Sequence, residues 1–149
     1  MKENRQLIEG YKDFLANGKT ERECCEQIID RARRAGWKDI SEYETIKAGD
    51  KVYVSKWGKA VALFTIGTEP LEKGMNILGA HIDSPRLDVK QNPLYENNFL
   101  VYLNTHYYGG IKKYQWVTLP LALHGVICKK DGTTVNVCIG EKPGDPVFC

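Results

Sequence analysis

A nearly continuous apolar run at 75–80 (Met-Asn-Ile-Leu-Gly-Ala) constrains the fold most, because it leads directly into a histidine and an aspartate. A short run of this kind is typical of a strand that is covered on both faces of a sheet. On an extended chain His81 and Asp83 point to one side, while Ile82 faces the other. We therefore expect a buried central strand that ends in polar side chains, where ligands collect in layered α/β proteins.

The pair His81 and Asp83 has two interpretations. A carboxylate at this spacing can accept the second N–H of the imidazole, which fixes the tautomer of a zinc-bound histidine and makes its other nitrogen a better ligand. Alternatively, Asp83 and Ser84 bond to nearby backbone in a surface turn, and His81 is simply solvated. His81, Asp83 and Ser84 by themselves leave both interpretations open.

Two amphipathic helices are predicted ahead of this stretch. Thr20 and Glu23 have the form of a capping box, which predicts the start of a second helix that runs to Gly36. A first helix is predicted before Asn17 and Gly18, because its apolar residues recur at helical spacing: Leu7, Tyr11, Phe14 and Leu15. Packing against a core accounts for both apolar stripes.

The remaining pattern is β-rich. Residues 52–56 and 60–66 contain many β-branched and aromatic residues and predict a hairpin around Gly58. After Pro93 three strands are expected with no helical pattern between them, at 99–103, 121–127 and 134–138. The fold class is therefore α/β in the first part, followed by an all-β second part.

Composition excludes several classes of function. The chain has 21 basic and 19 acidic residues among 149, so its net charge of +2 gives no argument for nucleic acid or for a membrane surface. No run is long enough to span a bilayer and the N-terminus leads into no signal-peptide core, so a cytoplasmic protein is expected. The five cysteines include no Cys-x-x-Cys pair, which suits neither a zinc ribbon nor a disulfide framework.

Two longer sequence motifs, one of which contains His81 and Asp83, carry more information than the pair alone. Residues 79–90 read GAHIDSPRLDVK and residues 105–116 read THYYGGIKKYQW. Together with residues 11–23, these strings closely resemble the aspartyl aminopeptidase family of dinuclear zinc exopeptidases. The resemblance implies that residues 1–92 are the N-terminal part of the peptidase domain and that residues 93–149 begin an inserted β-rich dimerisation domain.

The same resemblance implies a function. It implies a zinc-dependent aminopeptidase that removes N-terminal, by likeness acidic, residues from peptides and that forms a homo-oligomer through the β-rich domain. His81 is implied as a zinc ligand and Asp83 as the catalytic-site residue that orients it, with two zinc ions in a complete site. No nucleic acid or membrane partner is expected.

Most of the implied ligand set is missing. In the family, a bridging Asp, an adjacent Glu-Glu pair that supplies the general base and a ligand, another acidic ligand and a second His follow the His-x-Asp motif. The chain contains no Glu-Glu, and no two of its acids after Asp83 are adjacent: Asp88, Glu96, Asp131, Glu141 and Asp145. We therefore expect an N-terminal fragment that supplies one zinc ligand and is inactive by itself, since a catalytic zinc needs three protein ligands.

Three alternatives stay open. His106 and His124 could be ligands, but each lies in a strand-like segment with no carboxylate of matching phase nearby, so packing is favoured. The chain could instead be a non-catalytic assembly module whose β half pairs with another copy. A base-stacking surface for nucleic acid is the weakest alternative, because strand packing also explains its residues: Tyr102, Tyr107, Tyr108, Lys112, Lys113, Tyr114 and Trp116.

Overall fold

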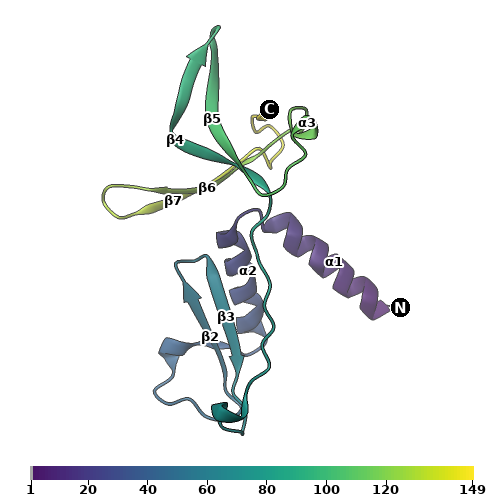
Figure 1. Ribbon diagram of the computed structural model, residues 1–149, viewed down its shortest axis with the longest axis vertical. Helices are drawn as coiled ribbons and strands as arrows, with labels where there is room; N and C mark the ends of the chain where they lie inside the picture. Colours follow the sequence, from purple (N-terminus) through teal and green to yellow (C-terminus); the bar gives the residue numbers. More distant parts are fainter. Residues whose placement is uncertain (1) are drawn as a thin grey trace. The chain divides into compact units, whose positions relative to one another are not determined.

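The computed structural model describes residues 2–149, and their side chains from residue 4 onward. The chain folds as two compact units, one ending at Asp83 and the other running from Ser84 to Cys149 (Figure 1). The mixed α/β class is confirmed. None of the described helices is long and apolar enough to cross a membrane.

Both predicted helices are present in the first unit. α1 spans Lys2–Asn17 and α2 spans Glu21–Arg34. The capping box is confirmed, because Thr20 Oγ1 accepts from the Glu23 backbone N–H at 3.3 Å and the Glu23 carboxylate accepts from the Thr20 N–H at 2.8 Å. This exchange satisfies N–H groups that have no partner inside the helix, so the sequence itself fixes where α2 begins.

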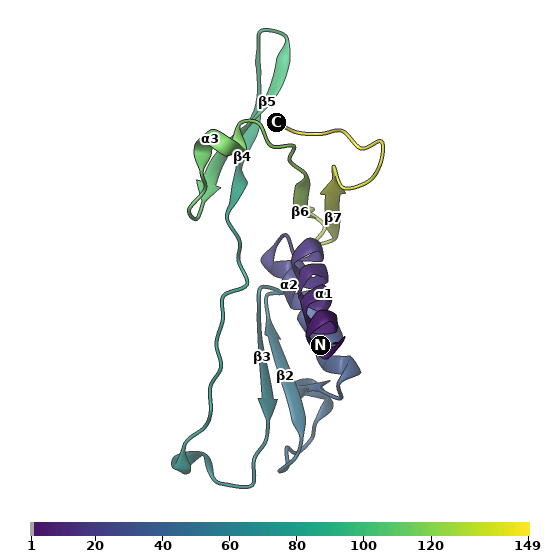
Figure 2. The same cartoon turned by 90° about the vertical axis from the view of Figure 1, so that its right-hand side faces the viewer.

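A small sheet packs beside α2. It contains β1 (Lys38–Asp39), β2 (Lys51–Lys56) and β3 (Ala60–Thr65), with η1 (Ile40–Glu42) between the first two, and the predicted β2–β3 hairpin is confirmed. Figure 2 shows α2 lying along β2 and β3. The buried core comes from these elements alone among the described side chains: Cys24, Cys25 and Ala32 of α2, and Val52 and Tyr53 of β2.

The expected central strand at 75–80 is wrong. After η2 (Leu71–Lys73) the chain is extended but unpaired, and Ile77 and Leu78 are almost completely exposed. A strand is stabilised by hydrogen bonds to a neighbouring strand, and no described segment lies in register with this one. His81 therefore follows an irregular segment, not a buried strand.

The second unit is built from two antiparallel hairpins. β4 (Arg86–Asn97) pairs with β5 (Leu100–Tyr108), and β6 (Leu123–Cys128) pairs with β7 (Thr134–Ile139). The three strands predicted in this half are confirmed, whereas β4 was not predicted and the short helix α3 (Lys113–Trp116) interrupts the expected all-β pattern. A domain boundary near residue 92 stays a prediction, and that residue lies within β4.

Candidate metal centre

The side chains of His81 and Asp83 contact each other through one imidazole nitrogen. The His81 Nδ1 lies 3.3 Å from Asp83 Oδ1 and 3.0 Å from the Asp83 backbone oxygen. Both partners are acceptors, so Nδ1 carries the proton and donates it to them. Nε2 then keeps its lone pair for a metal, on a side chain that is 83% exposed.

This geometry has the form predicted from the spacing, although the strand that was expected to produce it is absent. Two residues on an extended segment still point to one side, whether or not the segment is paired. His81 and Asp83 therefore make this contact although the expected central strand does not form. The role of His81 as a ligand and of Asp83 as its orienting carboxylate stays a prediction.

The described side chains complete no metal site. Among residues 4–149, no three His, Cys, Asp or Glu side chains lie close enough together to hold an ion. The donor chemistry of His81 fits zinc, which accepts a neutral imidazole nitrogen, but a catalytic zinc requires further protein ligands. His81 can therefore fill one coordination position of a larger zinc site.

The expectation that no carboxylate lies near the other two histidines is wrong for His124, whereas His106 has only an aspartate opposite it on the neighbouring strand. His124 lies 3.1 Å through Nε2 from Glu141 Oε1, and its side chain is only 12% exposed. His106 is the cross-strand partner of Asp88 and stacks on Tyr107 with ring centroids 5.1 Å apart. Sequence separation conceals both pairs, because strand register places Asp88 opposite His106, and the turn after β7 brings Glu141 to His124.

A pocket for an acidic substrate would need a cation, and Arg86 and Lys113 of the second unit each make another contact. Arg86 donates through Nε to Asp88 at 2.7 Å, and its guanidinium lies 4.1 Å from the centroid of the Tyr108 ring. Lys113 Nζ lies 4.1 Å from the Tyr107 centroid. Both contacts hold the cations within the second unit, so neither supports acidic specificity.

The first unit has an open cavity of about 660 Å³ between α1 and α2. Its lining is mainly apolar and includes Tyr11, Phe14 and Ile28, with Arg31 at 5.4 Å from the centroid of the Phe14 ring. Among the residues whose side chains are described, no acid or histidine lines it. The cavity therefore offers no ligand for a metal and plays no part in the candidate centre.

Comparison with known proteins agrees with the motif. Residues 14–149 match the sequence profile of the family described as aminopeptidase I zinc metalloprotease (M18). A protein of Clostridium acetobutylicum named "Probable M18 family aminopeptidase 1" is 60% identical over 152 residues, which cover 99% of this chain and 33% of that protein. The chain thus spans about a third of the length of the curated relatives that it matches.

Solved structures give the same result. Aminopeptidase I from Borrelia burgdorferi B31 superposes with a TM-score of 0.89 at 40% identity, covering 99% of this chain and 37% of that one. An M18 aminopeptidase from Thermotoga maritima gives a TM-score of 0.91 at 41% identity, covering 98% and 32%. The family profile, the identity and the superposition agree over nearly the whole chain, which therefore belongs to the aminopeptidase I zinc metalloprotease family (M18).

Proposed function

We propose that the protein is a zinc-dependent aminopeptidase that removes N-terminal residues from peptides, with His81 as a zinc ligand. The observation that carries the proposal is the contact between His81 Nδ1 and Asp83, which leaves Nε2 available to a metal. It lies within the segment that matches a zinc metalloprotease family. The relatives' names support the aminopeptidase reaction.

In this proposal His81 and Asp83 have separate tasks. His81 would donate Nε2 to the metal, while Asp83 keeps the proton on Nδ1 and restrains the ring. Zinc, when bound, polarises the scissile carbonyl and supplies a nucleophilic water at neutral pH. We expect a pair of zinc ions in the complete site, with the general base and the remaining ligands contributed from outside these 149 residues.

Three finer features complete the proposal. A preference for acidic N-terminal residues needs a cationic pocket, and Arg86 and Lys113 are already occupied by other contacts. We therefore place the selecting cation outside this chain. A cytoplasmic location and a homo-oligomer that forms through the β-rich half are the other two parts of the proposal.

The test uses the product of the complete gene. We expect bound zinc by elemental analysis and hydrolysis of an aspartyl-anilide faster than that of a leucyl-anilide. His81→Ala should abolish turnover and lower the zinc content, whereas the 149-residue chain alone should show no turnover. Full activity in the His81→Ala protein would refute the ligand assignment, and equal rates on the two anilides would refute acidic preference alone.

A second candidate function is a non-catalytic assembly module. The second unit favours this function, because its described strands form two separate two-stranded sheets, β4–β5 and β6–β7, whose outer edges have no strand neighbour. A gene product of this length that self-associates, binds no zinc and hydrolyses neither anilide would support the module and contradict the enzyme.

A further inference from the structure

The two sequence motifs at 79–90 and 105–116 meet where β4 begins and β5 ends. Gly109, just after β5, has a φ of 74°, and a Cβ placed on it would lie 3.4 Å from Pro85. The proposed function gives this second motif no role. Its backbone nevertheless packs directly against the residues that follow Asp83.

Arg86 restrains the same segment through three contacts. Its Nη1 donates to the Ser84 backbone oxygen at 3.4 Å, and its Nε donates to Asp88 Oδ1 at 2.7 Å. Its guanidinium carbon lies 4.1 Å from the ring centroid of Tyr108, its cross-strand partner. A planar guanidinium that stacks on a ring and donates along its fork keeps little freedom, so the Ser84 carbonyl is held to the start of the hairpin.

The chain between Asp83 and Arg86 is short and stiff. Pro85 has a fixed φ and disfavours the helical region for the residue before it, so Ser84 is restricted to extended conformations. The peptide that joins Asp83 to Ser84 is planar, so the Asp83 oxygen lies in one plane with the Ser84 nitrogen and Cα. This is the oxygen that accepts from His81 Nδ1 at 3.0 Å. Holding Ser84 therefore limits how far that oxygen can turn away from the imidazole.

We propose that Arg86 is a positioning residue for the zinc ligand His81. With Tyr108 and Gly109 it forms a clamp on the two residues that follow Asp83, and this clamp keeps the Asp83 backbone oxygen directed at Nδ1. The proton then stays on Nδ1, and Nε2 stays available to the metal. The inference rests on the proposed function, because it takes His81 as a ligand, and it names the residues that hold this ligand in its tautomer.

The clamp acts on one of the two acceptors of His81 Nδ1. The other acceptor is the Asp83 carboxylate, whose Oδ1 lies 3.3 Å from Nδ1 and belongs to the side chain. Either acceptor can keep the proton on Nδ1, so loosening the clamp alone costs little zinc affinity. Once Asp83 is replaced by asparagine, the tautomer depends mainly on the backbone oxygen. The clamp should therefore matter more in that background, which is a non-additive effect.

The test is a double-mutant cycle on the zinc affinity of the complete gene product, measured by competition with a chromophoric chelator. Arg86→Met keeps an unbranched side chain and removes all three contacts. It should weaken zinc affinity by about threefold alone and by about tenfold in the Asp83→Asn background, since hydrogen-bonded partners of a metal-bound histidine supply about 10- to 100-fold. A purely structural role gives the same factor in both backgrounds. Equal factors, or no effect in either background, would overturn the proposal.

A second pair of variants tests the clamp without changing Arg86. Gly109→Ala puts an L side chain at a positive φ, and relaxation of that strain moves the backbone that packs on Pro85. It should weaken zinc affinity by about threefold, as Arg86→Met does. Gly132→Ala is the matched control, because Gly132 has a φ of 84° and its added Cβ meets no described atom within 4 Å. Equal losses of zinc affinity in the two glycine variants would contradict the clamp.

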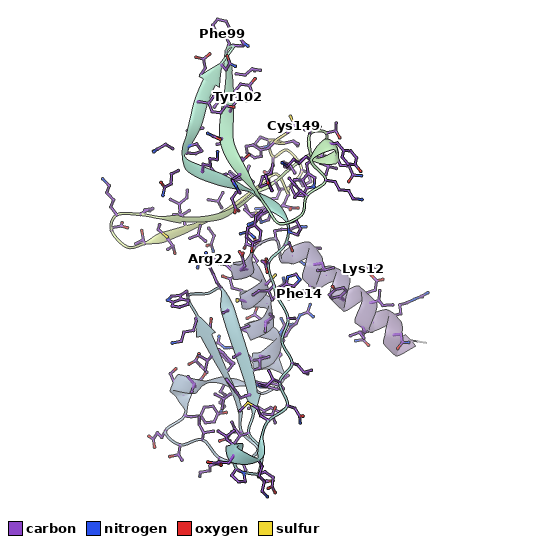
Figure 3. All side chains as sticks on the ribbon, viewed as in Figure 1. Lys12, Phe14, Arg22, Phe99, Tyr102 and Cys149 are labelled. Carbon is purple, nitrogen blue, oxygen red and sulfur yellow. The ribbon has the colours of Figure 1, made fainter. Side chains whose placement is uncertain are left out.

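A control in the same hairpin separates the clamp from general stability. Figure 3 shows Tyr102 on the part of the hairpin that leads to Phe99 at its tip. Tyr102 stacks on Tyr95 with ring centroids 5.2 Å apart, so Tyr102→Leu should lower the unfolding temperature. Its zinc affinity should stay within about twofold of wild type. A loss of zinc affinity equal to that of Arg86→Met would show that any weakening of the hairpin has this effect, and would overturn the proposal.

Two further variants separate this inference from the proposed function. Asp88→Asn keeps an oxygen that accepts from Arg86 Nε, so the clamp and the zinc affinity should be retained. Unchanged zinc affinity in His81→Ala would refute the proposed ligand itself. A loss of zinc affinity in His81→Ala, with wild-type affinity in Arg86→Met and Gly109→Ala in both backgrounds, would overturn the clamp and leave the proposed function standing.

Discussion

Replacing Asp83 by asparagine tests whether the carboxylate near His81 orients a zinc ligand. The change keeps the size of the side chain and removes its charge. In the structure Asp83 accepts from Nδ1 in two ways, through Oδ1 at 3.3 Å and through its backbone oxygen at 3.0 Å. Asparagine offers only an uncharged amide oxygen in place of the carboxylate, so the first contact is weakened, whereas the backbone oxygen is unchanged and can still fix the tautomer.

The magnitude follows from this partial loss. Removing the hydrogen-bonded partner of a metal-bound histidine typically weakens metal affinity by about 10- to 100-fold. Since one acceptor survives and both side chains are partly exposed, we expect the lower end, about tenfold, which is about 1.4 kcal/mol. His81→Ala should cost more, because it removes the ligand itself.

The assay is a zinc competition titration of the complete gene product with a chromophoric chelator. Asp88→Asn is the matched control, since that carboxylate accepts from Arg86 and should change zinc affinity by less than about twofold. A zinc affinity unchanged in Asp83→Asn, or reduced equally in Asp88→Asn, would refute the orienting role. Unchanged zinc binding in His81→Ala would refute the metal site as assigned.

Three further predictions concern stability and reactivity. Phe99→Gly should raise the free energy of unfolding by about 1 kcal/mol in urea titration, because Phe99 has a φ of 61° in the hairpin turn, where glycine is not strained. A lower free energy of unfolding would show that the exposed ring of Phe99 stabilises the turn more than its backbone strain destabilises it. Thr20→Ala should lower the free energy of unfolding by about 1 kcal/mol, because α2 loses its N-cap. An unchanged free energy of unfolding would mean that α2 begins independently of Thr20. Burial raises the pKa of the Cys24 and Cys25 thiols, with nearby carboxylates adding to the shift at Cys24 and the Cys24 thiol adding at Cys25. The contribution of these thiols to stability should therefore be constant below the ordinary thiol pKa of 9.0 and fall as pH rises above it, because the unfolded thiols ionise first. A stability that rises above pH 9.0 would contradict this burial.

Local patterns in the sequence determined the helices and the first hairpin. The capping box at Thr20 and Glu23 places the start of α2, because its hydrogen bonds lie within four consecutive residues. The β2–β3 hairpin follows from β-branched residues around a turn at Gly58, whose φ is 63°. The contact between His81 and Asp83 was also predictable, since it depends only on two-residue alternation. The M18 aminopeptidase family followed from long motif strings, whereas the aspartyl subtype stays a prediction.

Tertiary structure decided what depends on a partner that is distant in sequence. The apolar run at 75–80 has the composition of a buried strand, but it stays unpaired and exposed because no described strand offers it hydrogen bonds. The turn that follows β7 brings Glu141 to His124 on the paired strand β6, and the register of β4 and β5 places Asp88 opposite His106. Composition records which side chains favour a sheet, whereas pairing in space determines which of them form one and what chemistry they bring together.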